Sequence, residues 1–481
     1  MKQQDAYIVI DIGTGNARVA VVRPDGRVLS VARDNVRYHK DELYPDALYF
    51  EPAVLWEQVS TLARQALAAA PGVQIKAITG TSQREGIVLI DHKGKSLIGL
   101  PNIDHRGREW EDLVPGKSRV YRLTGRYPSS LFSAFKLVGI REKRKDTWKK
   151  LAFFLSISDW VEYQLTGHAK YEYSQASETL LFDVARKEWS AELTGLFGID
   201  SSLLPPLAAS GTIAGTILKK TADSLGIPAD AVVVTGGGDT QLAVKSTRPL
   251  LDDMVIVSGT TTPLVKLVNS YVTDPGERTW TSRDIEEKRF MLEANAGVTG
   301  LNYQRLKEIF YPNEGYDIIE EELAANSNSH CMASLGSLVA GEKSPPTKGG
   351  FVFPVPVTHT LTRSCFVKAT LLDIAFSIAE NYKILYEVAG HTHDYVWACG
   401  GGLQSPALRR FIANSINKEL RVREGFEQSS ATGGAFVCNH ALQVKTTLPG
   451  KVDITVPGGK DDMAALYSAW KQTRAGFWQI R

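Results

Sequence analysis

Cysteine is scarce in this sequence. Its four copies are widely spaced and form no CxxC pair: Cys331, Cys365, Cys399 and Cys438. This spacing excludes a zinc site of the CxxC type and the dense disulfide framework of small secreted domains. Four cysteines among 481 residues fit a reducing compartment, so the expected location is the cytoplasm.

Long apolar runs and an excess of charge of one sign are also missing. No uninterrupted apolar stretch is long enough to span a bilayer, and residues 1–5 carry no secretory signal, so no membrane partner is expected. The formal net charge at pH 7 is only +2. Proteins that bind nucleic acid usually carry a clear basic excess, so nucleic acid is not an expected partner either.

What the sequence does contain is an alternation of strand-like and helix-like segments, over a length that exceeds a single hydrophobic core. The alternation predicts an α/β protein. Residues 53–70 have the apolar spacing of an amphipathic helix, and strands are expected at residues 8–10, 19–22, 75–79 and 87–91. A further strand at residues 231–234 is expected to end the first of two domains, which we place at residues 1–247 and 248–481.

The most informative segment is Asp11-Ile12-Gly13-Thr14-Gly15-Asn16, which lies between two apolar stretches and predicts a β-hairpin. The amide groups of such a turn form a nest for phosphate oxygens, the Thr14 hydroxyl adds a donor, and Asp11 can hold a hydrated divalent cation. A Walker loop or a dinucleotide fingerprint leads from a strand into a helix instead. On this motif alone, an ordinary hairpin with a surface aspartate stays open as an alternative.

A similar unit recurs in the second half, where the turn Ser258-Gly259-Thr260-Thr261 separates strands expected at residues 254–257 and 264–268. Because no short-period repeat accompanies it, the recurrence indicates a duplicated domain rather than a solenoid. Two more glycine-rich segments follow expected strands: Gly236-Gly237-Gly238-Asp239 and Cys399-Gly400-Gly401-Gly402-Leu403-Gln404-Ser405.

Two such hairpins facing each other across a cleft resemble the actin, hexokinase and heat-shock-protein ATPase superfamily. The ordered segments are most similar to the FGGY carbohydrate kinases, and stretches such as Ile157-Ser158-Asp159-Trp160-Val161 resemble the bacterial autoinducer-2 kinases. The resemblance implies a two-domain actin/hexokinase-like (ribonuclease H-like) α/β ATPase fold with a central cleft. It also implies ATP and Mg²⁺ as cofactors and Asp239 as the catalytic general base.

On this resemblance, two sets of residues bind the nucleotide. The phosphate contacts would be Asp11, Gly13, Thr14, Gly15, Asn16, Gly259, Thr260 and Thr261. The adenosine contacts would be Gly400, Gly401, Gly402, Gln404 and Ser405. Asp11 and Asp239 would hold the metal through water. The alternative for Asp239 is a cap of the helix expected at residues 240–244.

The acceptor side is expected at Thr81-Ser82-Gln83-Arg84-Glu85-Gly86, whose donors and acceptors at a strand end suit a polyhydroxy compound. Glycerol kinases carry a similar Gln-Arg-Glu run, and Asn102-Ile103-Asp104-His105-Arg106 resembles the Asp-x-Arg segment of the family. The expected acceptor contacts are therefore Gln83, Arg84, Glu85, Asp104 and Asp239. The alternatives are a solvated hairpin with an Arg–Glu pair, and a surface loop around Asp104.

Together these features predict an ATP-dependent carbohydrate kinase that phosphorylates a hydroxyl of a small sugar, polyol or sugar-derived compound. Autoinducer-2, a pentulose, a polyol such as a pentitol or glycerol, and gluconate stay open as acceptors, since Gly139 stands where the family usually has Trp and Thr261-Thr262-Pro263-Leu264 lacks an expected aromatic. The alternative from another class is a non-catalytic, nucleotide-dependent binding protein that kept the fold. The sequence leaves the oligomeric state open, a homodimer included.

Overall fold

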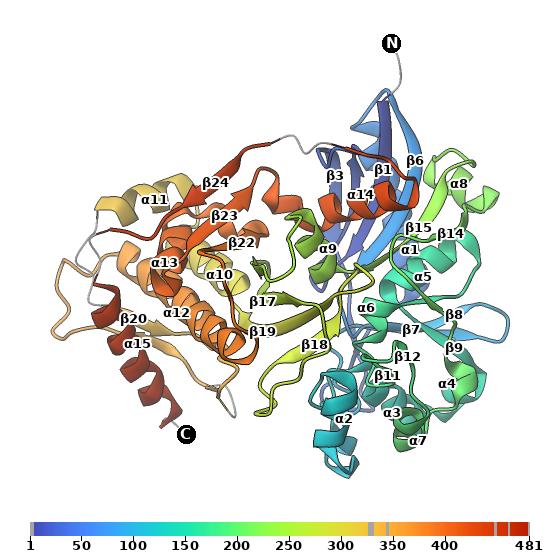
Figure 1. Cartoon of the computed structure of the whole chain (residues 1–481), viewed down its shortest axis with the longest axis horizontal. Coiled ribbons are helices and arrows are strands. Elements are labelled where there is room, and N and C mark those ends of the chain that lie inside the picture. Colours follow the sequence, from blue (N-terminus) through green and yellow to red (C-terminus); the bar gives the residue numbers. More distant parts are fainter. Residues whose placement is uncertain (1–3, 326–330, 343–345, 447–449, 460–461, 480–481) are drawn as a thin grey trace.

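The computed structural model describes residues 4–325, 331–342, 346–446, 450–459 and 462–479. Two large sheets form the centres of two lobes (Figure 1). All strands of the first sheet precede residue 239, and all strands of the second follow residue 253. The α/β class is confirmed. Within the described ranges, no helix combines the length and the apolar composition that a bilayer crossing requires.

The first sheet has six strands in the order β14 (Ile213–Thr216), β15 (Val232–Gly238), β6 (Val73–Ser82), β1 (Gln4–Ile12), β2 (Asn16–Val22) and β3 (Val28–Asn35). β6 runs parallel to both of its neighbours, β1 and β15, whereas β1, β2 and β3 form an antiparallel meander. The hairpin expected around residues 11–16 is the connection between β1 and β2, and this prediction is confirmed.

Alternate residues of β1 face two different layers of helices. Ile8 and Ile10 pack with α1 (Pro52–Ala68) and α5 (Ile157–Thr166) on one side of the sheet. Tyr7 and Val9 pack with α9 (Asp239–Ser246) and α14 (Ser429–Ala441) on the other side. Successive side chains of a strand point to opposite faces, so a strand covered on both faces has to be apolar throughout.

The second sheet has the order β18 (Trp280–Arg283), β19 (Phe290–Val298), β17 (Thr261–Val268), β16 (Met254–Val257), β22 (Tyr395–Cys399), β23 (Glu419–Arg423) and β24 (Val452–Thr455). The second expected hairpin is the antiparallel connection between β16 and β17. One face of the sheet is covered by α10 (Gly300–Phe310), α11 (Tyr316–Ala325), α12 (Arg363–Ala389), α13 (Pro406–Ile416) and α15 (Met463–Trp478).

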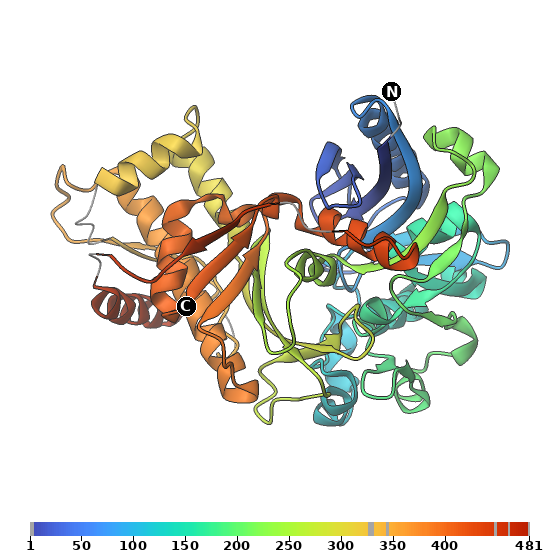
Figure 2. The ribbon, with the colours of Figure 1, turned by 45° about the horizontal axis from the view of Figure 1, so that its top comes forward.

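The helix α9 lies between the two sheets. Leu242 belongs to the apolar cluster of the first sheet, whereas Ala243 and Val244 belong to that of the second. Beside it lies α14, which comes from the C-terminal half of the chain and yet packs on the first sheet (Figure 2). The hydroxyl of Tyr7 donates a hydrogen bond to Asn439 Oδ1 over 2.8 Å. The two lobes are therefore joined through a shared pair of helices.

A smaller sheet extends the first lobe, in the order β8 (Ser96–Leu100), β7 (Ile87–Asp91) and β9 (Leu151–Ser156). It packs with α2 (Lys117–Thr124), α3 (Ser133–Lys143) and α7 (Ala191–Phe197) around a separate apolar cluster. The remaining short elements are β4 (His39–Lys40), β5 (Leu48–Tyr49), α4 (Lys145–Lys150), β10 (Tyr171–Glu172), α6 (Tyr173–Ala176), β11 (Phe182–Asp183), β12 (Glu188–Trp189), β13 (Leu207–Ala208), α8 (Lys219–Leu225), β20 (Met332–Ser334) and β21 (Gly350–Val352).

The contact between α9 and α14 leaves no room for a side chain at Gly433. A Cβ at this position would lie 1.8 Å from the carbonyl oxygen of Leu242. Because the obstacle is backbone, we expect Gly433→Ala to lower the free energy of unfolding by about 1–3 kcal/mol. In the control Gly476→Ala, also in a helix, the Cβ would meet nothing within 4 Å, so stability should stay equal or rise slightly. Equal urea midpoints for the two variants would contradict this packing.

Candidate active site

Three parallel strands bring the expected chemical groups to one edge of the first sheet. Asp11 of β1 lies opposite Thr81 of β6, and Gly238 of β15 lies opposite the next residue of β6. The loop at residues 83–85 follows β6, and Asp239 follows β15. In α/β proteins, ligands bind outside the carboxyl ends of parallel strands. The three segments named from the sequence are therefore neighbours in the fold.

Asp11 is buried at this edge, with an exposed fraction of 2%. Its Oδ2 accepts hydrogen bonds from the Arg18 guanidinium and, over 2.6 Å, from the Ser430 hydroxyl. Its Oδ1 is buried and has no hydrogen-bond partner among the described residues. A buried carboxylate oxygen without a partner is costly, so Oδ1 is the atom available to a ligand. The surface aspartate of an ordinary hairpin is therefore not what the structure contains.

Asp239 is the first residue of α9. The N-cap position belongs to Gly238, so Asp239 lies one position inside the helix, although its Oδ1 accepts the N–H of Thr240 in the first turn over 2.7 Å. Burial, and after it the charge of Asp11, raises the pKa of Asp239 to about 6, against the opposing effect of Arg84. Asp239 thus lies close to the Asp11 carboxylate, and burial together with that negative charge favours the uptake of a proton or a cation at Asp239.

The turn between β1 and β2 is held by its own backbone and by neighbouring segments of the first lobe. The Gly13 N–H donates to the Asn16 carbonyl over 3.0 Å, and the Asn102 amide donates to the Thr14 hydroxyl over 2.9 Å. The N–H groups of Thr14 and Gly15 donate to no group in the described part of the chain. The turn therefore presents two free amide donors, which is the geometry expected of a phosphate nest.

The glycines of the turns divide into two groups. Gly400 has a φ of +100°, and a Cβ there or at Gly402 would lie 2.3 Å from a protein atom, so the fold itself requires both. Gly15 and Gly401 have no positive φ, and a Cβ at either would meet nothing within 4 Å. At Gly259 the nearest atom would be 3.8 Å away. Glycine at these last three positions suits a close approach of the backbone to a ligand.

In the second lobe, three segments meet beside the second turn. The Gly402 N–H donates to the Ser258 carbonyl over 2.9 Å, and the Thr299 N–H donates to the Thr260 carbonyl over 3.2 Å. A Cβ at Gly300 would lie 2.1 Å from a backbone oxygen of the second turn. Sequence reasoning missed this start of α10. The signal for it was the run of small residues at the end of β19.

Ser405 and Gln404 differ in their surroundings. Ser405 is the N-cap of α13, where its hydroxyl accepts the Leu408 N–H over 3.1 Å and donates to the Glu320 carboxylate. Gln404 is exposed at the end of the turn. The structure thus places Gln404 where a ligand can reach it, whereas the Ser405 hydroxyl is already engaged. The adenosine contacts of both residues stay predictions.

Gln83 and Asp104 support the loops around the site. Gln83 donates to the Gly13 carbonyl over 3.1 Å and accepts the Asn102 N–H over 2.8 Å. Asp104 is fully buried and accepts hydrogen bonds from a backbone N–H over 2.9 Å and from Arg106 over 2.8 Å. The surface-loop alternative for Asp104 is therefore wrong. Because the polar atoms of both side chains are engaged within the protein, their contact with an acceptor stays a prediction.

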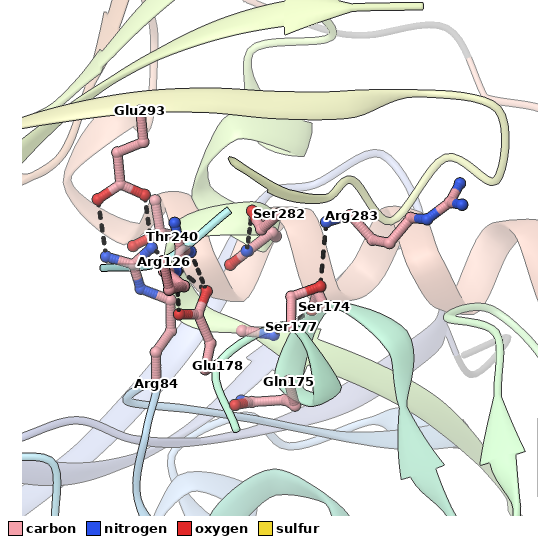
Figure 3. Close-up of polar contacts among 12 residues, drawn as sticks. Arg84, Arg126, Ser174, Gln175, Ser177, Glu178, Thr240, Ser282, Arg283 and Glu293 are labelled. Carbon is pink, nitrogen blue, oxygen red and sulfur yellow. Dashed lines mark hydrogen bonds and ion pairs between the residues drawn. The ribbon is translucent and has the colours of Figure 1, made fainter. Parts of the chain in front are cut away.

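Arg84 connects the two lobes. Its guanidinium donates to both carboxylate oxygens of Glu293 on β19, over 2.5 and 2.9 Å, and lies 3.7 Å from Glu178 (Figure 3). Glu178 in turn accepts two hydrogen bonds from Arg126, over 2.5 and 2.9 Å. Burial works to raise the pKa of Glu293, but the charge of Arg84 holds it below its usual value. The alternative of a solvated hairpin with an Arg–Glu pair is therefore wrong. The carboxylate that pairs with Arg84 comes from the other lobe.

Glu85 keeps its carboxylate free. Its backbone is left-handed, with a φ of 62°, its exposed fraction is 5%, and no hydrogen bond or ion pair with a described residue engages its side chain. Burial raises the pKa of Glu85 to about 8. The buried Lys136 donates instead to the carbonyls of Asn102, Asp104 and Leu131. A strained, buried and unengaged acid at this edge is typical of a functional residue.

Comparison with known proteins identifies the family, because two of its models match separate parts of the chain. Models of the FGGY family of carbohydrate kinases match residues 6–245 (N-terminal domain) and 320–442 (C-terminal domain). A Bacillus subtilis protein named "Putative sugar kinase YoaC" is 49% identical over 99% of this chain and 98% of its own length. The autoinducer-2 kinase of Salmonella typhimurium is 27% identical over 67% of this chain and 62% of its own length.

Solved structures share the fold at low sequence identity. A Plasmodium falciparum glycerol kinase with ADP has a TM-score of 0.85 at 18% identity, covering 99% of both chains. A ligand-bound xylulose kinase from Lactobacillus acidophilus has a TM-score of 0.82 at 17% identity, covering 99% of this chain and 98% of that chain. The expected two-domain actin/hexokinase-like fold is thereby confirmed.

Removal of one partner from the buried pair of Arg84 and Glu293 should be severe, because it leaves an uncompensated buried charge. We expect Glu293→Ala to lower the free energy of unfolding by about 3–5 kcal/mol. The matched control is Glu192→Ala, since Arg119 and Glu192 form an equally bidentate pair, with both distances 2.9 Å, on side chains that are 54% and 52% exposed. For this control we expect little change in the free energy of unfolding. Urea unfolding measures the stability of both variants. Similar losses of stability in Glu293→Ala and Glu192→Ala would contradict a cost that is set by burial.

Proposed function

The chain belongs to the FGGY family of carbohydrate kinases, and we propose that it phosphorylates a hydroxyl of a small, neutral sugar, polyol or sugar-derived carbonyl compound with ATP. The observation that carries this proposal is the pair of carboxylates at the common strand edge. Asp239 has a pKa raised to about 6, and Asp11 keeps a buried oxygen without a partner. Autoinducer-2, a pentulose and a polyol are the candidate acceptors within this class.

Asp239 acts as the general base. It takes the proton of the acceptor hydroxyl as the hydroxyl oxygen attacks the γ-phosphorus of ATP. A carboxylate with a pKa near 6 is ionised at neutral pH and is a better proton acceptor than an ordinary aspartate. Its place at the first position of α9, after a strand that ends at the site edge, leaves the carboxylate facing the region that Asp11 also faces.

Asp11 and Asp239 fit a magnesium ion that is bound through water. Magnesium in phosphotransferase sites keeps several waters and uses one or two carboxylates together with the substrate phosphates. The unpartnered Oδ1 of Asp11 supplies an oxygen for such a hydrated ion. When bound, the ion would offset the negative charge of the β- and γ-phosphates.

The nucleotide is held from both lobes. Free amides and glycines support phosphate binding by Gly13, Thr14, Gly15 and Asn16 on one side and by Gly259, Thr260 and Thr261 on the other. The segment from Gly400 to Ser405 would hold the adenosine. We propose residues 1–247 as the acceptor domain and 248–481 as the adenosine domain. Within the second of these, α14 is the exception, because it packs on the first sheet and brings Ser430 to Asp11.

Charge balance favours a neutral acceptor. Arg84 and Arg126 are each paired with a buried carboxylate, and Lys136 is held by backbone carbonyls. A carboxylate on the acceptor would therefore have to compete for these engaged cations, beside Asp239. Burial raises the pKa of Glu85 to about 8, so at neutral pH this side chain is largely protonated. A protonated carboxyl both donates and accepts hydrogen bonds, which suits a hydroxyl group.

The non-catalytic alternative would require loss of the base or of a phosphate turn. Asp239 and both turns are retained, which supports the enzyme. The cytoplasmic location and a homodimer stay predictions.

Asp239→Asn keeps the shape of the side chain and removes its ability to take up a proton. We expect kcat with a neutral acceptor to fall about 10²–10⁴-fold, with the affinity for ATP nearly unchanged. The measurement is ATP-to-ADP turnover with Mg²⁺ over pentuloses, pentitols, glycerol, autoinducer-2 and gluconate. Retained turnover in the variant would remove Asp239 from the role of base. A preference for gluconate in the unaltered protein would contradict the neutral acceptor.

The value of kcat/KM should fall as the pH drops through about 6, because protonated Asp239 cannot accept the hydroxyl proton. The control is Glu85→Gln, which removes the group whose pKa is about 8 and leaves Asp239 in place. The decline near pH 6 should persist in this variant. If it vanishes, the titrating group is Glu85 and not Asp239.

A further inference from the structure

The end of β15, just before Asp239, is irregular and is held by side chains. The pairing of β15 with β6 shifts between Val234 and Gly237, so part of this backbone leaves the regular ladder. The Gly236 N–H donates to Glu162 Oε1 over 2.7 Å, and the Thr81 hydroxyl donates to the Gly237 carbonyl over 2.9 Å. Buried side chains therefore replace ladder hydrogen bonds in the run of three glycines that precedes Asp239.

The backbone N–H of the third glycine, Gly238, is held by a relay of two side chains. The Gly238 N–H donates to Ser174 Oγ over 3.1 Å, and the Ser174 hydroxyl donates to Glu172 Oε2 over 2.5 Å. The same oxygen of Glu172 accepts the N–H groups of Ser174 and Gln175 over 2.8 and 3.0 Å. An ionised carboxylate only accepts, so the Ser174 hydroxyl points its proton to Glu172 and its lone pair to Gly238.

Close packing keeps this relay against the glycine run. Glu172 and Ser174 have exposed fractions of 1% and 0%. A Cβ at Gly237 would lie 3.0 Å from Ser174 Oγ and 3.3 Å from Glu172 Oε2. Asp239 has no comparable support of its own, because the hydrogen bonds of its carboxylate with described residues go only to Thr240. The direction of the Asp239 side chain therefore depends on how its backbone is held.

We propose that Glu172 and Ser174 are positioning residues that aim the Asp239 carboxylate at the acceptor hydroxyl through the Gly238 N–H. This inference rests on the proposed function, in which Asp239 is the base. Glu172 and Ser174 are buried behind the backbone of the glycine run, so neither side chain lies at the exposed surface of the site. Loss of the relay should therefore lower kcat and leave the KM values for ATP and acceptor nearly unchanged.

Ser177 provides a matched control on the same turn of chain. It is equally buried, with an exposed fraction of 1%, and its hydroxyl also accepts a backbone N–H, from Arg283 over 3.1 Å (Figure 3). We expect Ser174→Ala to lower kcat about tenfold, and Ser177→Ala to leave it within about twofold. Thermal unfolding should shift to a similar extent in the two variants. Equal kcat values in the two variants would overturn the proposal.

A second pair of variants tests the carboxylate without removing the serine. Glu172→Gln keeps an acceptor oxygen at this place, so kcat should fall less than in Glu172→Ala, in which kcat should fall about as much as in Ser174→Ala. The assay pH of about 8 lies above the pKa of Glu172, which burial raises to about 7. A normal kcat in Glu172→Ala would overturn the relay.

Ser174→Ala in the background of Asp239→Asn separates this inference from the proposed function. If the relay acts through Asp239, the added Ser174→Ala change should not lower the residual rate further. A further tenfold loss in that background would mean that Ser174 acts by another route and would overturn the relay. Failure of the proposed function looks different, because Asp239→Asn alone would then keep its turnover.

Discussion

Parallel pairing of β6 with both β1 and β15 is the constraint on which the rest of the site depends. Parallel strands end at the same edge, so Asp11, the loop at residues 83–85 and Asp239 converge although they are far apart in the sequence. The edge is crowded with charge. Burial and, after it, the charge of Asp11 raise the pKa of Asp239, and the irregular end of β15 has to be held by buried side chains because the ladder no longer does so.

Buried charge also governs how the lobes meet. Arg84 of the first lobe and Glu293 of the second are both buried, and either would be costly without the other. Glu178 and Arg126 continue this arrangement, so the positive charge beside the proposed acceptor region is already compensated. The same contacts that join β19 to the first lobe therefore bear on which acceptors are favourable. Because α9 packs on both sheets, the backbone of Asp239 also belongs to the connection between the lobes.

The strands and turns of the two hairpins could be predicted from local sequence patterns. The strands around residues 8–10 and 19–22 and the turns at residues 13–15 and 258–261 follow from continuous apolar stretches that are interrupted by glycine and threonine. The helix α12 was not predicted, because it is buried on nearly all sides and lacks the one-sided apolar spacing of a surface helix. Local patterns also could not separate Gly15 and Gly401, which the fold does not need, from Gly400 and Gly402, which it does.

By itself, the sequence determined the α/β class, the two hairpins and the residue types proposed to bind phosphate, because these depend on short-range periodicity and turn chemistry. Only the tertiary structure decided which polar side chains are engaged within the protein and which remain available to a ligand. Gln83 and Asp104 are engaged by neighbouring loops, Arg84 by a glutamate from the other lobe, and Glu85 by no described side chain. The partners of these groups lie up to 209 positions away along the chain, and no local pattern specifies a contact at that separation.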